Sequence, residues 1–149
     1  MTGSRAFTVV HAFTAAVAVD ATRPLITFYD DATGERVELS GATLANWVAK
    51  TANLLVDGMG LGPGQVAAVR LPPHWQTAAI LLGCWSAGLT VDLAGSGTAD
   101  VAFVTAEVDP RPAADETYAL SLAPLGLPFR PGPPTGTTDF TLEVRGYGD

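Results

Sequence analysis

The alternation of apolar and polar positions places a βαβ unit at the centre of the chain. Residues 66–71 form an apolar run with a single interruption, which is typical of a parallel strand covered on both faces. After the Pro72-Pro73 corner, residues 74–87 are apolar almost all the way round, and this predicts a helix buried on most sides. A glycine ends that helix before a second apolar strand at 89–93. We therefore expect a parallel sheet with helical cover.

The preceding third of the chain predicts two more helices and a hairpin. Residues 5–19 carry a wide apolar stripe, which predicts a helix that packs on a sheet. Residues 25–30 and 35–39 are strand-like, and the Asp-Ala-Thr-Gly segment between them has the composition of a type I turn, so the pair predicts a β-hairpin. A capping serine opens an amphipathic helix over residues 40–57.

The pattern becomes less regular after residue 93. Only seven residues precede the next apolar run at 101–105, whereas a helical crossover needs roughly a dozen. This run is expected either to follow a bare loop to a nearby edge or to lie outside the regular strand order. From residue 106 onward the chain is rich in proline, and residues 118–122 and 140–144 are short strand candidates.

These elements together predict an α/β fold with a mostly parallel sheet, helices on both faces and an edge β-hairpin. A chain of 149 residues is of ordinary size for one domain. We expect a single domain over residues 1–149, with a core at 1–105 and a proline-rich tail with short strands at 106–149.

Charge and cysteine content exclude several classes of partner. The net charge is −7 and the eight Lys and Arg residues are scattered singly, so the chain has no electrostatic footprint for nucleic acid or an anionic membrane. The single cysteine, Cys84, falls inside the buried helix and predicts a structural thiol. Arg5 and the following apolar run imitate a secretory signal poorly and are too short to span a membrane, which favours a cytoplasmic protein over an exported one.

Three groups of residues resemble chemical sites and are better explained as structural. His11 has no second ligand at metal spacing, and the hairpin carboxylates Asp30, Asp31, Glu35 and Glu38 are explained by a solvated turn. The glycines of residues 58–64 follow a helix and open a strand, which is the reverse of a phosphate-binding loop. We therefore predict no metal site and no catalytic residue.

One polar group remains as a candidate ligand site. Residues Asp92, Ser96, Thr98 and Asp100 follow the strand at 89–93. We expect them to gather at the carboxyl end of a central strand, where open α/β sheets bind ligands. A polar turn is the alternative interpretation.

Four stretches of the chain occur in an order that is recognisable. They are the strand and cap at 36–40, the glycine-rich turn and strand at 60–69, the Leu-Pro-Pro corner at 71–73, and the helix end and strand at 84–93. From about residue 24 to residue 93 the chain resembles the N-terminal portion of the adenylate-forming superfamily of acyl-CoA synthetases, peptide adenylation domains and luciferases. It is most similar to short bacterial proteins that resemble this portion alone.

The resemblance implies the fold of the first subdomain of those enzymes, without their chemistry. Members bind ATP phosphates on a Ser/Thr/Gly-rich loop ending in Pro-Lys-Gly and use a lysine on a separate C-terminal domain. Neither element is present here. The nearest similarity is at residues 135–138, where Asp139 follows and its carboxylate would repel a phosphate. No cofactor is expected, and whether the chain is an enzyme stays open.

Three functions are consistent with these observations. The preferred one is a non-catalytic binding or interaction module of ligase-like ancestry. The alternatives are part of an incomplete adenylate-forming ligase, which needs missing sequence or a partner chain, and a small ligand-binding protein that uses the turn at 92–100. A reading frame that continues past Asp149 into a Thr-Ser-Gly-type loop would favour the second.

The composition also predicts association. The chain is 48% hydrophobic and only 15% charged, which suggests more apolar surface than a small monomer leaves in water. We expect a homodimer or a stable protein partner.

Overall fold

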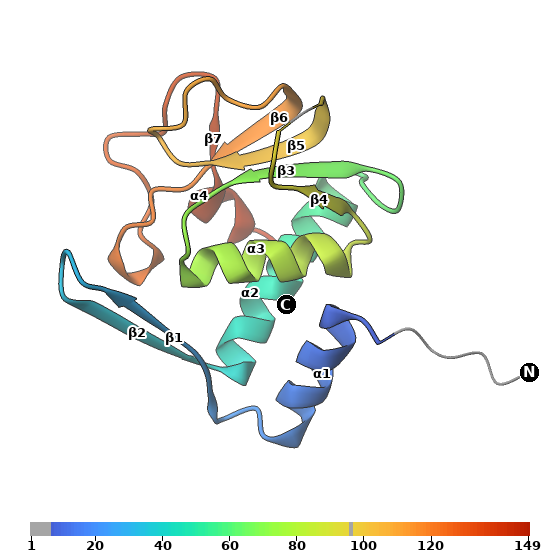
Figure 1. The fold of residues 1–149 in the computed structure, drawn as a ribbon, viewed down its shortest axis with the longest axis vertical. Coiled ribbons are helices and arrows are strands. Elements are labelled where there is room, and N and C mark those ends of the chain that lie inside the picture. Colours follow the sequence, from blue (N-terminus) through green and yellow to red (C-terminus); the bar gives the residue numbers. More distant parts are fainter. Residues whose placement is uncertain (1–6, 96) are drawn as a thin grey trace, which may run out of the picture.

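A computed structural model describes residues 7–95 and 97–149, and its centre is a five-stranded parallel sheet (Figure 1). All neighbouring strands of this sheet run parallel, in the order β4-β3-β5-β6-β7. The α/β class expected from the sequence is confirmed. The strands are β3 (Val66–Arg70), β4 (Thr90–Asp92), β5 (Ala99–Val104), β6 (Ala114–Ala119) and β7 (Thr138–Asp139).

The predicted βαβ unit is present. Helix α3 (Trp75–Ser86) connects β3 to β4, whose first residues pair in register, Val66 with Thr90. The helix begins directly after His74, whose backbone is extended. Nδ1 of His74 accepts a hydrogen bond from Gln76 N at 3.1 Å. This cap satisfies one of the amide groups that a helix N-terminus leaves unpaired.

Helix α2 (Gly41–Asn53) also begins at the predicted cap. Ser40 Oγ accepts from Thr43 N at 3.2 Å, and a π-helical turn, η1 (Leu54–Gly58), continues the helix into the core. Leu54 and Leu55 of this turn are essentially inaccessible to solvent.

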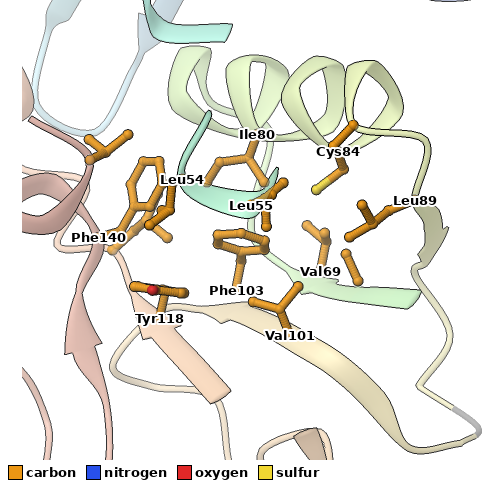
Figure 2. Close-up of a cluster of buried hydrophobic side chains, with 14 residues drawn as sticks. Leu54, Leu55, Val69, Ile80, Cys84, Leu89, Val101, Phe103, Tyr118 and Phe140 are labelled. Atoms are coloured by element: carbon orange, nitrogen blue, oxygen red, sulfur yellow. The ribbon is translucent and has the colours of Figure 1, made fainter. Parts of the chain in front are cut away.

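The main hydrophobic core lies between the sheet and the helices (Figure 2). Phe103 of β5 stacks on Tyr118 of β6 with 5.8 Å between ring centroids, and it meets Phe140 edge-on at the same separation. Because Phe140 belongs to α4 (Phe140–Val144), the core joins α4, η1 and α3 to one face of the sheet. All helices that contact the sheet among the described residues cover this face, which departs from the expected cover on both faces.

The second face of the sheet carries small residues and is crossed by loops. Ala68, Ala99 and Ala102 form its cluster. Gly95, in the connection from β4 to β5, lies against the guanidinium of Arg70, which projects from the same side of β3 as Ala68. The loops on this side are visible above the sheet in Figure 1. They take the place of helical crossovers.

This arrangement answers the question left by the short connection after residue 93. Strand β5 pairs with β3 on the side opposite to β4, so the chain passes over β3 as a bare loop and β5 keeps the regular parallel order. Right-handed crossovers require such a reversal of direction to use the opposite face of the sheet.

The predicted hairpin is confirmed, and its place is corrected. Strands β1 (Pro24–Asp30) and β2 (Glu35–Ser40) pair antiparallel as a separate two-stranded sheet and do not extend an edge of the parallel one. The hairpin instead lies beside α2 and α3, as Figure 1 shows.

The predicted first helix is present as α1 (Val9–Val19), and residues 5 and 6 lie outside the described residues. Its expected packing on the sheet is wrong, because α1 contacts α2 and α3 and none of its residues is buried. Among the described residues, no helix has the length and apolar character needed to cross a membrane.

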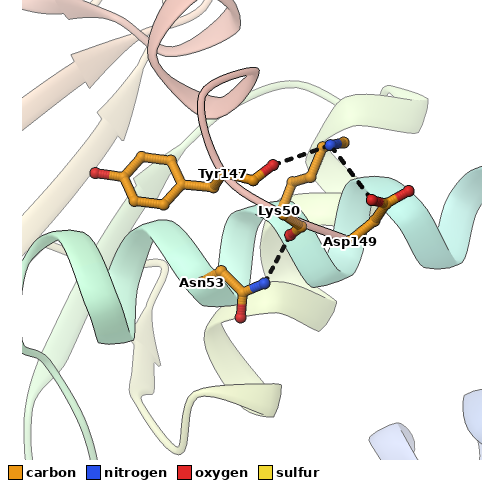
Figure 3. A network of polar contacts seen from close by, with 5 residues as sticks. Lys50, Asn53, Tyr147 and Asp149 are labelled. Atoms are coloured by element: carbon orange, nitrogen blue, oxygen red, sulfur yellow. Dashed lines mark hydrogen bonds and ion pairs between the residues drawn. The ribbon is translucent and has the colours of Figure 1, made fainter.

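The C-terminal residues are held against α2 (Figure 3). Lys50 Nζ donates to Tyr147 O at 2.9 Å and lies 3.8 Å from an Asp149 carboxylate oxygen, and Asn53 Nδ2 donates to Gly148 O at 2.6 Å. The strand expected at 140–144 is wrong, because these residues form α4, capped by Asp139 through Thr141 N and Leu142 N.

Cys84 lies in the core, and its expected inertness gives a direct test. Burial raises the pKa of its thiol to about 12. Since the thiolate is the reactive form, the native protein should show no measurable reaction with Ellman's reagent at pH 8, whereas protein in 6 M guanidinium should react fully within minutes. Rapid labelling of the native protein would mean that α3 opens easily.

Candidate functional site

The structure separates the residues predicted to form a ligand site at 92–100. Asp92 is the last residue of β4, at the edge of the sheet, whereas Asp100 is the second residue of β5 and lies near the amino end of that strand. Thr98 is exposed in the loop, and Ser96 lies outside the described residues. The expected gathering at the carboxyl end of a central strand is therefore wrong.

The carboxylates of both aspartates serve the local backbone. Asp92 Oδ1 accepts from Ala94 N at 2.8 Å and from Gly95 N at 2.9 Å, which closes the turn after β4. Asp100 Oδ2 accepts from Val66 N at 2.8 Å and so joins the starts of β5 and β3. Binding of a ligand at this turn stays a prediction.

A groove at the other side of the molecule is a better-formed candidate. It lies between the hairpin and the start of α3, directly after the carboxyl end of β3, and has a volume of about 480 Å³. Ligands of α/β proteins bind at this end of the strands, and pockets of roughly 300–1,000 Å³ hold small organic molecules. We call it the hairpin groove; its lining residues are Ile26, Thr27, Phe28, Tyr29, Pro73, His74, Trp75, Thr77, Ala78 and Leu81.

The period of the strand explains which hairpin residues face α3. Ile26, Phe28 and Asp30 alternate with more exposed neighbours along β1, so they share one face of the hairpin. On α3, Ala78 and Leu81 are three residues apart and lie on one side of the helix. Apolar side chains from two elements far apart in sequence therefore form the groove.

His74 stands at the end of the groove. Its ring lies 4.4 Å from the ring of Phe28 and 5.5 Å from that of Trp75, measured between centroids. Burial lowers the pKa of His74 from its usual value of 6.5, and the neighbouring Asp30 carboxylate only partly opposes this shift. Since Nδ1 accepts the Gln76 amide, the neutral ring carries its proton on Nε2.

A second hollow adjoins the groove across His74 and Phe28. This acidic hollow, of about 330 Å³, is lined by Asp30, Asp31 and Glu35 together with Leu122, which follows β6. Asp30 and Glu35 are a cross-strand pair in the hairpin register and therefore share the face that looks toward His74. Two connected hollows result, one apolar and one acidic.

The sequence contained a usable signal for this site. His74 directly follows the Leu-Pro-Pro corner that ends β3, and a residue just after a parallel strand lies at the binding end of the sheet. The sequence did not show that the hairpin packs beside the start of α3. Because of that packing, three of the four carboxylates interpreted as a solvated turn, Asp30, Asp31 and Glu35, line the hollow beside His74.

The depressed pKa of His74 predicts a pH-dependent stability. Because the unfolded histidine, with a pKa of about 6.5, takes up a proton before the folded one, stability is full above pH 6.5 and falls as the pH drops through the lowered folded pKa. The variant His74→Asn keeps a capping side chain and should lose this component. Urea midpoints at pH 8 and pH 5 measure the difference, and parallel losses in both proteins would contradict it.

Within residues 7–95 and 97–149, no three His, Cys, Asp or Glu side chains come together as a metal ion would require. The carboxylates of the acidic hollow face an open surface. Asp30 also accepts from Ala32 N at 2.9 Å within its own turn.

Solved structures of acyl-CoA synthetases and a CoA ligase superpose on most of this chain. Acetoacetyl-CoA synthetase from Streptomyces lividans superposes with a TM-score of 0.73 and 19% identity over 94% of this chain and 25% of that enzyme. The anthranilate CoA ligase AuaEII, solved with anthranoyl-AMP, gives 0.72 and 15% over 95% and 28% of the two chains. An acyl-CoA synthetase of Brucella canis gives 0.61 and 22% over 85% and 25%.

The chain therefore has the fold of the N-terminal portion of acyl-CoA synthetases. No protein-family model matches it. A TIGR03089 family protein of Mycobacterium tuberculosis is 49% identical over 138 residues, which cover 87% of this chain and 56% of that protein. The chain spans just over half the length of this curated relative.

Proposed function

We propose that this protein is a binding module with a ligase-like fold, which binds a small organic molecule in the hairpin groove and catalyses no reaction by itself. The observation that carries the proposal is that polar side chains elsewhere are hydrogen-bonded to backbone amides, whereas the hairpin groove is open. Asp92, Asp100 and Asp139 are engaged with backbone amides, and Nδ1 of His74 caps α3. The hairpin groove, by contrast, is open and mostly lined by apolar atoms.

Pyrophosphate exchange with Mg-ATP and a panel of carboxylic acids tests the absence of catalysis. We expect no exchange with the chain alone, and no binding of Mg-ATP tighter than a Kd of roughly 100 μM, about 5.5 kcal/mol, in calorimetry. Either activity would contradict the proposal.

A second candidate is one part of an adenylate-forming ligase. It is favoured by the sheet face that carries Ala68, Ala99 and Ala102 under loops, since such a face suits the packing of further structure. The same exchange assay separates the two candidates when it is repeated with a separately expressed remainder of an acyl-CoA synthetase. Activity only in the mixture would favour the ligase.

We also propose that the module self-associates through α1. This helix has no charged residue between Val9 and Val19, no buried residue, and Val9 and Val19 are 57% and 79% exposed. Hollows lie along it, one of them against the exposed Trp85. Two molecules that each carry a net charge of −7 repel one another, so an uncharged apolar face suits contact between copies.

The variant Val9→Asp tests this association without weakening the helix, because an acidic residue in the first turn is favourable there. Sedimentation of the wild-type protein at micromolar concentration should show twice the monomer mass of 15.4 kDa, and V9D should sediment as a monomer. Leu93→Asp changes a similarly exposed apolar residue elsewhere and should stay dimeric. A wild-type monomer would count against the proposal.

A further inference from the structure

The hairpin groove and the acidic hollow share four lining residues, which makes them two parts of one surface. Phe28, Tyr29, Pro73 and His74 border both. A molecule of moderate length can therefore lie with one end among aromatic and aliphatic side chains and with the other end beside carboxylates. The two ends demand different chemistry.

The apolar end favours a flat, ring-containing body. The rings of Phe28, Tyr29 and His74 line this part of the surface, and the His74 ring is tilted by 54° against that of Phe28. Aromatic pairs with offset or edge-to-face geometry gain about 0.5–1.5 kcal/mol beyond burial of their area. Thr27, Tyr29, His74 and Thr77 are the polar side chains that line the groove.

The acidic end selects a cation. Asp30, Asp31 and Glu35 line the acidic hollow, and none of the described residues that line it is Lys or Arg. An anionic group placed here would face three carboxylates, whereas an ammonium group would be attracted to them. The guanidinium of Arg36 instead lies over the Tyr29 ring and pairs with Glu38, so it does not neutralise the hollow.

We infer that the site takes a small aromatic amine in its protonated form, with the ring in the hairpin groove and the ammonium group beside Asp30 and Glu35. The inference rests on the proposed function and adds the class of ligand. It gives Asp30 and Glu35 a role in binding a cation, which a negatively charged carboxylic acid would not require.

The test compares three probes of nearly equal size by amide-resolved NMR titration: 2-phenylethylamine, 2-phenylethanol and 3-phenylpropanoate. The amine should shift the amides of residues 26–30 and 74–81 with a Kd in the millimolar range, as expected for a fragment of about nine non-hydrogen atoms. The alcohol should bind more weakly than the amine, by up to about fivefold, and the carboxylate should bind most weakly of the three.

Two variants check the source of the selectivity. The double variant Asp30→Asn/Glu35→Gln should lose about fivefold in affinity for the amine and keep its affinity for the alcohol. The matched control Glu38→Gln removes a carboxylate from the opposite face of the same hairpin and should leave both unchanged.

Each other outcome has a defined meaning. Equal binding of amine and alcohol, or tighter binding of the carboxylate, would overturn the inference that the ligand is an amine. The groove would still be a binding site. Shifts of the same amides with protein concentration alone would mean that a second copy of the chain binds in the groove, and this would overturn the inference of a small-molecule ligand. If no probe shifts these amides, the proposed function itself fails.

Discussion

Replacing Phe103 with alanine should remove about 3–5 kcal/mol of folding free energy, which is a large part of the roughly 5–15 kcal/mol that stabilises a domain. Phe103 is completely inaccessible to solvent, and its ring contacts the rings of Tyr118 and Phe140. Its position joins β5, β6 and α4 (Figure 2). The truncation leaves a cavity that the packed interior can fill only partly.

Urea unfolding followed by circular dichroism measures this loss. The same substitution at Phe7, which is 78% exposed, is the control and should change stability by less than about 0.5 kcal/mol. Equal effects of the two variants would show that the aromatic cluster is not the centre of the core.

Replacing Gly83 with leucine should have a comparable effect by the opposite mechanism, overpacking. A Cβ atom at Gly83 would lie 2.5 Å from Cγ2 and 2.6 Å from Cβ of Thr51, so α2 and α3 are already in direct contact at this point. Inserting a side chain must push the helices apart or force a strained rotamer, at a cost of about 1–3 kcal/mol or more. Thermal unfolding of the variant should show a clear loss.

The control places the same side chain on an exposed position of the same helix, Ser86→Leu, which should leave the melting temperature nearly unchanged. A double-mutant cycle tests the contact itself. Thr51→Gly removes the side chain that a methyl group at residue 83 would meet, so Thr51→Gly combined with Gly83→Ala should cost less than the sum of the single changes. Strict additivity would mean that the two helices do not meet there.

Local patterns along the chain carried enough information for the central elements. The βαβ unit from β3 to β4, the capped helix α2 and the hairpin were all predicted, because each depends on periodicity, capping and turn residues within a short window. Residues 140–144 show the limit of this reasoning. Phe140, Leu142 and Val144 alternate with polar residues as in a strand, yet Asp139 caps a helix, Phe140 and Val144 are buried one turn apart, and Leu142 is 57% exposed.

The candidate site lay beyond the reach of such patterns. The hairpin groove exists because β1 packs beside a helix that begins more than 40 residues later, and hydrophobic periodicity identifies an apolar face without naming its neighbour. The same limit applied to the turn at 92–100, where side chains close in sequence are used at different ends of their strands.

The type and order of most elements could be predicted from the sequence, since these follow from the burial needs of short segments. The tertiary structure alone decided which face of the sheet the helices cover, how a bare loop carries β5 across β3, and which side chains surround His74. Those features depend on contacts between distant segments. Their free energy comes from packing that no single segment contains.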